Sequence, residues 1–196
     1  MRGSKKIGLY FGTFNPIHVG HLTIANYMVE YSDLDEVWLV VTPHNPHKKK
    51  NSLLDDIHRL AMVRIAVEDY PKLKASSIEF DLPQPNFTVN TLAHLEEKYP
   101  EYEFCLIMGE DNLKSFHKWK NYEVILERYA IYIYPRISEG RVESRFMDHP
   151  AITLIEAPIM ELSSTFIRNA IKKNKNIRPM LPDAVWKYLD EMNFYR

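Results

Sequence analysis

The sequence predicts an α/β fold, a doubly wound parallel sheet of five to six strands with helices on both faces. Apolar runs rich in β-branched residues recur along the chain, and segments with helical periodicity separate most of them. Strands that alternate with helices are typical of a parallel sheet. In addition, runs such as EVWLVV at 36–41 are apolar almost throughout. That pattern is expected of a strand whose two faces are both buried.

The apolar runs give the expected strands in order. They lie at 7–11, 36–41, 76–80, 104–108, 129–134 and 152–156. Apolar residues at helical spacing give the expected helices between them. These helices lie at 21–31 (HLTIANYMVEY), 57–70 (IHRLAMVRIAVEDY) and 88–99 (TVNTLAHLEEKY). The segment LPDAVWKYLDEMNFY predicts a last helix with Pro182 in its first turn.

Composition limits the class of protein. The 196 residues are 45% hydrophobic and carry 25 basic and 26 acidic side chains, a net charge of −1. This balance argues against a nucleic-acid or membrane partner. No apolar stretch reaches the ~20 residues that span a bilayer, and no signal-peptide pattern opens the chain. The single Cys105, in an apolar run, predicts a buried thiol in a reducing compartment. We therefore expect a cytoplasmic protein.

The chain is expected to form one domain, because no repeat, low-complexity tract or linker divides it. That domain should cover 1–196, with a C-terminal helical part from about 160 to 196 packed on it. The expected sheet is Rossmann-like. Such sheets bind ligands at the carboxyl ends of the strands, where the strand order reverses.

The first strand-to-helix turn, GTFNPIHVGHL at 12–22, is suited to an anion. Gly12 allows the backbone to approach a ligand closely. The start of the following helix offers unpaired N–H groups and partial positive charge. His18 and His21 would lie beside that anion, and a neutral imidazole can donate a hydrogen bond to it. On their own, two histidines at this spacing fit an ordinary surface turn better than a binding site.

A metal site is the weaker interpretation of these histidines. His44 and His47 repeat the spacing of His18 and His21. However, a structural zinc ion takes four ligands and a catalytic one usually takes three, and no carboxylate is placed beside either pair. The sequence therefore predicts no protein-bound metal.

Two other segments carry candidate phosphate-binding groups. In LSSTFIR at 162–168, Ser163, Ser164 and Thr165 are residue types that begin helices, and Arg168 follows one turn later. This segment alone fits a plain capped helix. In PHNPHKKK at 43–50, the lysines alone fit a solvated charge run.

Together these motifs resemble the H-x-G-H nucleotidyltransferase superfamily. The pattern G-T-F-x-P-x-H-x-G-H is matched from Gly12 to His21, and LSSTFIR resembles the signature I-S-S-T-x-I-R. Pro46-His47-Lys48 resembles the P-H-K of a loop that carries a basic residue to the phosphates of ATP. The resemblance leaves open which of Lys48, Lys49 and Lys50 has that role.

Two further segments resemble bacterial nicotinate-nucleotide adenylyltransferases. They are PNFTVNTL at 85–92 and IMGEDNLKSFHKWKNYEVIL at 107–126, and the resemblance extends from Ile7 to Tyr195. The chain departs from the family pattern at Phe11, where glycine is common, at Asn15, where aspartate is common, and at Asn86-Phe87, which replace Ser-Tyr.

The resemblance implies transfer of the adenylyl group of ATP to nicotinate mononucleotide, giving deamido-NAD and pyrophosphate. The implied catalytic residues are His18, His21, Lys48 and Arg168. The implied ATP-binding residues are Gly12, Thr13, Phe14, His18, His21, Gly109, Asp111, Ser164, Thr165 and Arg168. The implied acceptor-binding residues are Asn86, Phe87, Thr88 and Trp119. Mg²⁺ would arrive with ATP and bridge its phosphate oxygens.

Three alternatives stay open from the sequence. A related adenylyl- or cytidylyltransferase would use another acceptor, such as phosphopantetheine. A nucleotide-binding protein would share the motifs without activity, and a metal hydrolase would use the eight histidines. The partners are expected to be small molecules, and a homodimer is among the oligomeric states that the sequence leaves open.

Overall fold

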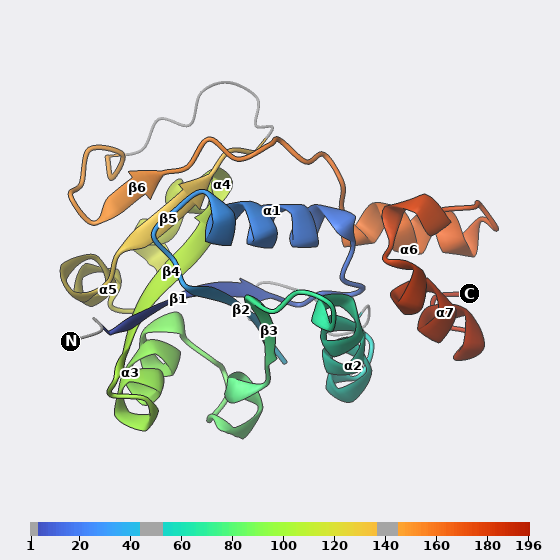
Figure 1. The fold of residues 1–196 in the computed structure, drawn as a ribbon, viewed down its shortest axis with the longest axis horizontal. Coiled ribbons are helices and arrows are strands. Elements are labelled where there is room, and N and C mark those ends of the chain that lie inside the picture. The colour runs from blue at the N-terminus through green and yellow to red at the C-terminus, as the bar shows by residue number, and fades with distance from the viewer. Residues whose placement is uncertain (1–3, 44–52, 137–144) are drawn as a thin grey trace.

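The computed structural model describes residues 4–43, 53–136 and 145–196 (Figure 1). In these residues, six parallel strands form one sheet in the order β3-β2-β1-β4-β5-β6. The strands are β1 (Lys5–Gly12), β2 (Glu36–Val41), β3 (Leu73–Ser76), β4 (Tyr102–Gly109), β5 (Ile131–Tyr134) and β6 (Ile152–Leu154). The chain moves outward from β1 to β3, returns to the centre at β4 and moves outward the other way. This order confirms the predicted doubly wound fold.

Helices cover both faces of the sheet. The α-helices are α1 (Val19–Glu30), α2 (Asp56–Val67), α3 (Thr88–Lys98), α4 (Glu110–Leu113), α5 (Tyr122–Arg128), α6 (Ser164–Lys172) and α7 (Asp183–Glu191). Short 3-10 helices are η2 (Ile78–Asp81), η3 (Phe116–Lys118) and η4 (Arg178–Met180). Figure 1 shows α1 on one side of the sheet and α3 on the other.

Two hydrophobic clusters result from the alternation of side chains along the strands. Leu9 of β1 packs in the cluster that includes α3 and α5, whereas its neighbour Tyr10 packs in the cluster that includes α1 and α2. Successive residues of a strand point to opposite faces of the sheet. A strand that is apolar on both faces therefore contributes side chains to both clusters. Burial of both faces of the strands explains the continuous apolar runs in the sequence.

The predicted third strand, at 76–80, is wrong. Strand β3 ends at Ser76, its pairing partner being Val40 of β2, and the 3-10 helix η2 follows. The Ser76 hydroxyl accepts a hydrogen bond from the Ile78 amide at 3.4 Å, and the Phe80 amide donates to the Ser77 carbonyl at 2.9 Å. Serine groups thus turn the chain where the apolar pattern predicts extension.

The C-terminal helices pack into the core on the α1 side. Ile167 of α6, together with Val185 and Leu189 of α7, belongs to the cluster that holds Tyr10 and Leu60. Figure 1 shows α6 and α7 beside α1 and α2 at one end of the molecule. No helix in the described ranges has the length and apolar character needed to cross a membrane.

Candidate active site

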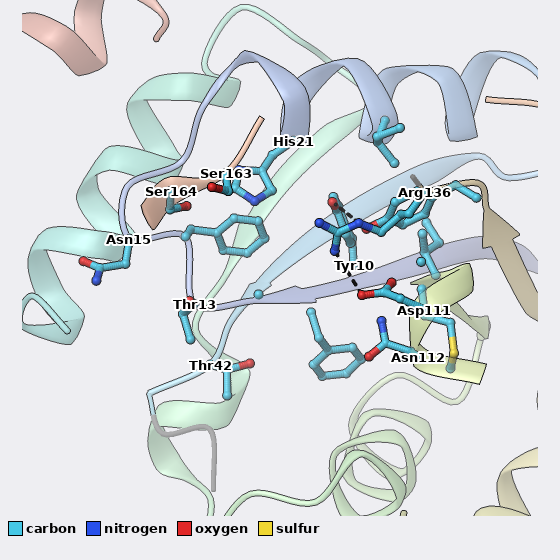
Figure 2. A pocket seen from close by; sticks show the side chains of 18 of the residues that line it. Tyr10, Thr13, Asn15, His21, Thr42, Asp111, Asn112, Arg136, Ser163 and Ser164 are labelled. Carbon is cyan, nitrogen blue, oxygen red and sulfur yellow. Dashed lines mark hydrogen bonds and ion pairs between the residues drawn. The ribbon is translucent and has the colours of Figure 1, made fainter. Parts of the chain in front are cut away.

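A cavity opens at the carboxyl ends of β1 and β4, where the strand order reverses (Figure 2). Its volume is about 1120 Å³, above the roughly 300–1,000 Å³ of common small-molecule pockets, so two ligands fit side by side. Every predicted site residue that the structure describes lines this cavity. These residues are Gly12, Thr13, Phe14, His18, His21, Asn86, Phe87, Thr88, Gly109, Asp111, Trp119, Ser164, Thr165 and Arg168. Lys48 lies outside the described residues.

The turn after β1 is held in a strained conformation. Phe14 is 1% exposed and has a φ angle of 43°. This angle lies in the left-handed region, which residues other than glycine rarely occupy. A side chain at Gly12 would meet the Phe14 ring, because a Cβ there would lie 2.8 Å from Cζ. Gly12 is therefore required for this packing. Backbone strain of this kind is often found at functional sites.

His18 and His21 lie at the start of α1 as a stacked pair. Their ring centroids are 3.7 Å apart, and the backbone N–H of His18 donates to Nδ1 of His21 at 3.2 Å. Since Nδ1 of His21 accepts, a neutral His21 carries its proton on Nε2 and presents a donor there. A Cβ at Gly20 would lie 3.1 Å from Nδ1 of His18, so the glycine keeps space for that ring.

His18 is a buried, neutral imidazole. Burial is the main cause that lowers its pKa from 6.5 to about 4, and the positive charge of Arg136 adds to the effect. The side chain is 3% exposed, and in the described part of the chain its Nδ1 atom has no hydrogen-bond partner.

Unpartnered buried atoms are concentrated in this cavity. Among the residues that the structure describes, the buried side-chain atoms without a hydrogen bond are Nδ1 of His18, Oε2 of Glu79 and Oδ1 of Asn86. All of these residues line the cavity. A buried polar atom left unpaired costs about 1–3 kcal/mol, so a cavity that collects them is suited to a polar ligand.

The N-terminus of α6 docks directly on the turn after β1. Ser163 caps the helix by accepting from the Phe166 amide at 3.1 Å. The Ser164 hydroxyl donates to the Pro16 carbonyl at 2.9 Å, and Nη1 of Arg168 donates to the Asn15 carbonyl at 2.7 Å. These bonds bring the N-termini of α1 and α6 to one wall of the cavity.

Arg136 is a cavity residue that the sequence analysis missed. It follows the carboxyl end of β5 and pairs with Asp111, whose Oδ2 atom lies 3.4 Å from Nη1 (Figure 2). The Arg136 side chain packs closely on Gly109. A Cβ at Gly109 would lie 2.6 Å from Cδ of Arg136. The position just after a parallel strand is the signal that could have found it.

The residues predicted for the acceptor gather at the start of α3. Phe87 is the N-cap residue, and no side chain caps the helix there. Asn86 donates from Nδ2 to the Glu79 carbonyl at 2.8 Å, and Oε1 of Glu79 accepts from the Thr91 hydroxyl at 2.8 Å. Burial raises the pKa of Glu79. Trp119, half-buried, packs edge-on against Phe116 with centroids 5.3 Å apart.

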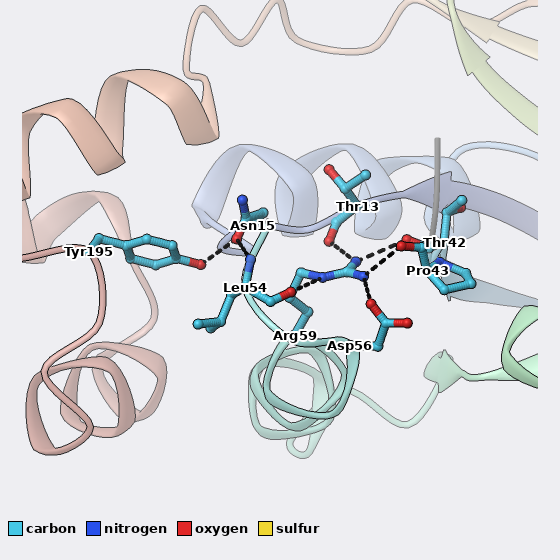
Figure 3. Close-up of polar contacts among 8 residues, drawn as sticks. All are labelled: Thr13, Asn15, Thr42, Pro43, Leu54, Asp56, Arg59 and Tyr195. Carbon is cyan, nitrogen blue, oxygen red and sulfur yellow. Dashed lines mark hydrogen bonds and ion pairs between the residues drawn. The ribbon is translucent and has the colours of Figure 1, made fainter. Parts of the chain in front are cut away.

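Arg59 joins the turn after β1 to the end of β2 (Figure 3). It is fully buried, and Nη1 donates to the carbonyls of Thr13 at 2.6 Å and Thr42 at 3.0 Å. Nε donates to the Leu54 carbonyl at 2.9 Å, and Asp56 pairs with the remaining nitrogen. In the sequence, Arg59 looks like one polar position of an amphipathic helix, so its role as a hub was missed.

The electrostatics of the cavity favour a polyanion. Arg168 and Arg136 bring positive charge to it, and the start of α1 brings a partial positive charge. The stacked histidines add hydrogen-bond donors. Such a site can hold several phosphate groups and stabilise charge that develops between them.

Comparisons with known proteins agree with this chemistry. Residues 9–170 match the family model described as cytidylyltransferase-like. A relative from Christiangramia forsetii is 69% identical over 193 residues, which cover 98% of this chain and 100% of the relative. A relative from Flavobacterium psychrophilum is 66% identical over 191 residues, covering 97% and 99%. Both are named probable nicotinate-nucleotide adenylyltransferase.

Solved structures share the fold. The Plasmodium falciparum nicotinic acid mononucleotide adenylyltransferase complexed with NaAD matches with a TM-score of 0.81 at 22% identity, and the match covers 97% of each chain. The complex of the same enzyme with APC matches with a TM-score of 0.80. The fold, the stacked histidines at the switch point and the near-full-length relatives lead to one conclusion. This chain belongs to the nicotinate-nucleotide adenylyltransferases, a family of nucleotidyltransferases.

Proposed function

We propose that this protein transfers the adenylyl group of ATP to nicotinate mononucleotide, giving deamido-NAD and pyrophosphate in NAD biosynthesis. One observation carries the proposal. The stacked His18–His21 pair and the fork of Arg168 face one cavity from two adjoining helix N-termini. That arrangement suits a triphosphate, and the remaining volume suits a second ligand.

The chemistry needs no base from the protein. The attacking group is the phosphate of the mononucleotide, whose second pKa is near ~6, so it is mostly a dianion at neutral pH. One of its oxygens forms a bond to the α-phosphorus of ATP. The bond from that phosphorus to the bridging oxygen of the β-phosphate breaks, and the electron pair leaves with pyrophosphate. The protein must align two anions and stabilise the charge between them.

The histidines and basic side chains divide this work. Nε2–H of His21 donates to an oxygen of the transferred phosphate, where negative charge grows in the transition state. His18, neutral because of its burial, accepts or donates without adding charge. Arg168 holds the leaving pyrophosphate with its planar fork, assisted by Ser164 and Thr165. Lys48, outside the described residues, is proposed for the same pyrophosphate.

The adenosine binds at the end of β4. Gly109 leaves room for it, and Asp111 accepts hydrogen bonds from the ribose hydroxyls. Arg136 now pairs with Asp111, so nucleotide binding would release its guanidinium toward the phosphates. Thr13 and Phe14 complete the wall opposite.

Nicotinate mononucleotide binds at the start of α3. Trp119 stacks on the pyridine ring beside Phe87, and the uncapped amides at the helix start receive the carboxylate. Asn86 and Thr88 close this end. A carboxamide would place its NH₂ group against backbone donors, so the acid should be preferred by roughly 10²-fold or more.

Mg²⁺ would enter with ATP, which would supply its ligands. In the described part of the chain, no group of three or more His, Cys, Asp or Glu side chains could hold a metal ion by itself. A donor set of imidazole and guanidinium groups suits phosphate oxygens rather than the magnesium ion. When bound, the ion neutralises triphosphate charge, and the residues above orient the phosphates.

A panel of acceptors tests the proposal. Purified protein is mixed with Mg-ATP and nicotinate mononucleotide, nicotinamide mononucleotide or phosphopantetheine, and pyrophosphate release is measured. We expect the highest kcat/KM for nicotinate mononucleotide. Preference for the amide would contradict the carboxylate site at α3, and preference for phosphopantetheine would contradict the assigned acceptor. Tight ATP binding with no pyrophosphate from any acceptor would indicate a binding protein instead.

A further inference from the structure

The segment after α7 turns back toward the active site. Asn193 follows the helix with a φ angle of 55°, and the Phe194 amide donates to the Leu189 carbonyl at 3.1 Å. This six-to-one bond with a left-handed residue is the Schellman ending of a helix, which reverses the chain. The next residue, Tyr195, also has a positive φ angle, of 65°.

Tyr195 reaches the turn after β1 (Figure 3). Its hydroxyl donates to Oδ1 of Asn15 at 2.6 Å, and the Leu54 amide donates to the same oxygen at 3.2 Å. Burial raises the pKa of Tyr195, so its hydroxyl keeps the proton that it donates. A non-glycine residue in the left-handed region is strained, and this anchored hydroxyl opposes relaxation of the segment.

Asn15 connects Tyr195 to the phosphate-binding groups. It is 2% exposed, it stands three residues before His18, and its carbonyl oxygen accepts from Nη1 of Arg168. Nη2 of Arg168 donates to the Thr165 hydroxyl at 3.1 Å. The orientation of the guanidinium fork thus depends on where the Asn15 backbone lies.

We infer that Tyr195 is a positioning residue for adenylyl transfer, which acts through Asn15 on Arg168. The inference rests on the proposed function. Asn15 and Arg168 line the cavity, whereas Tyr195 does not, so Tyr195 touches no substrate. Its hydroxyl fixes the side chain of Asn15, and the carbonyl of the same residue fixes Arg168. The segment after α7 is therefore part of the support of the triphosphate site.

The chain provides a matched control for this role. The Tyr188 hydroxyl, on α7, is hydrogen-bonded to Nδ1 of His58 on α2 at 2.8 Å. Neither Tyr188 nor His58 lines the cavity. Replacing either tyrosine by phenylalanine removes one hydroxyl and one part-buried hydrogen bond between the C-terminal part and the rest of the molecule.

The experiment compares Tyr195→Phe with Tyr188→Phe by kcat, KM for ATP and melting temperature. Both variants should melt within a few degrees of each other. For Tyr195→Phe we expect kcat/KM for ATP to fall about 3- to 10-fold, the range that one hydrogen bond accounts for. Tyr188→Phe should keep the wild-type value. Equal kinetic constants in the two variants would overturn the inference.

A double-mutant cycle separates the inference from the function on which it rests. If Tyr195 acts through Arg168, Tyr195→Phe should have less than a twofold further effect in an Arg168→Ala background. Multiplied effects would overturn that route. If Arg168→Ala itself leaves activity unchanged, the proposed function fails. If Arg168→Ala is severe while Tyr195→Phe behaves as Tyr188→Phe does, only the inference about Tyr195 fails.

Discussion

Burial decides the charge of His18, and this has a consequence for stability. In the unfolded chain the imidazole titrates near 6.5, whereas in the folded protein burial and Arg136 lower its pKa to about 4. Between these values the unfolded state binds more protons, so the folded protein loses stability as the pH falls from 6.5 to 4. This difference in the pKa of His18 corresponds to about 3 kcal/mol in the free energy of unfolding.

We therefore expect wild type to lose about 3 kcal/mol more than His18→Gln when urea unfolding is compared at pH 7 and pH 4. Parallel pH profiles of the two proteins would contradict this. In wild type, the NMR signals of the His18 imidazole should titrate with a pKa near 4. In Arg136→Met the pKa of His18 should rise only in part, because burial is the larger cause.

His21 should matter for turnover far more than for folding. In the proposed mechanism its Nε2–H donates to the phosphate at which charge develops, and loss of one such donor typically costs about 10²–10³ in kcat. We expect a loss of that size in His21→Ala, measured as kcat at saturating Mg-ATP. His94→Ala is the control, since His94 lies on α3 outside the cavity lining. A folded His21→Ala variant with near-normal kcat would show that the assigned role is wrong.

Single residues differ in how visible they are in the sequence. His18, His21 and Arg168 stand in motifs whose neighbours are also matched, so they could be predicted. Arg136 has no motif, and only its position just after a strand could have indicated it. Arg59 could not be predicted, because its contacts depend on which segments meet in space. Arg59 donates to carbonyl groups of two other segments, and backbone carbonyls leave no mark in the sequence.

At the scale of elements, periodicity predicted long helices best. The expected helix at 88–99 agrees with α3, and that at 57–70 with α2, to within three residues at each end. The third strand was wrong because Ile78 and Phe80 suggest extension, while serine hydrogen bonds turn the backbone. Local competition of this kind is invisible to a hydrophobic pattern.

The cap of α6 gives a prediction at this scale. Ser163 accepts from the Phe166 amide, and its replacement by alanine leaves that donor without its cap. We expect Ser163→Ala to lower the free energy of unfolding by about 1 kcal/mol, and Ser163→Gly by only a few tenths. Urea unfolding measures both. Equal losses in the two variants would indicate that the serine acts by something other than capping.

At the scale of the whole molecule, the doubly wound parallel sheet could be predicted but the joining of the two ends could not. Alternating strands and helices imply the doubly wound sheet, and its switch point implies where ligands bind. In contrast, the bonds from Arg168 and Tyr195 to Asn15 span 153 and 180 residues of sequence. Nothing in a local pattern predicts which distant groups will meet.

These contacts support the proposal that the chain is one domain and unfolds as one. The cluster that packs α6 and α7 also packs α1 and α2, with Val185 fully buried and Leu189 1% exposed. If α6 and α7 melted first, they would expose the buried sides of α1 and α2 and remove the supports of the turn after β1. Cooperative loss of both parts is therefore expected.

Two tryptophans can report on this separately. Trp38 lies on β2 in the cluster that includes α3, and Trp186 lies on α7. In variants that keep only one of the chain's three tryptophans, fluorescence of Trp38 follows the sheet and fluorescence of Trp186 follows the C-terminal part. We expect both signals to give the same urea midpoint, coincident with the loss of circular dichroism. An earlier midpoint at Trp186 would mean that the C-terminal part unfolds as a separate unit, and that the proposed triphosphate site can lose one wall while the sheet remains intact.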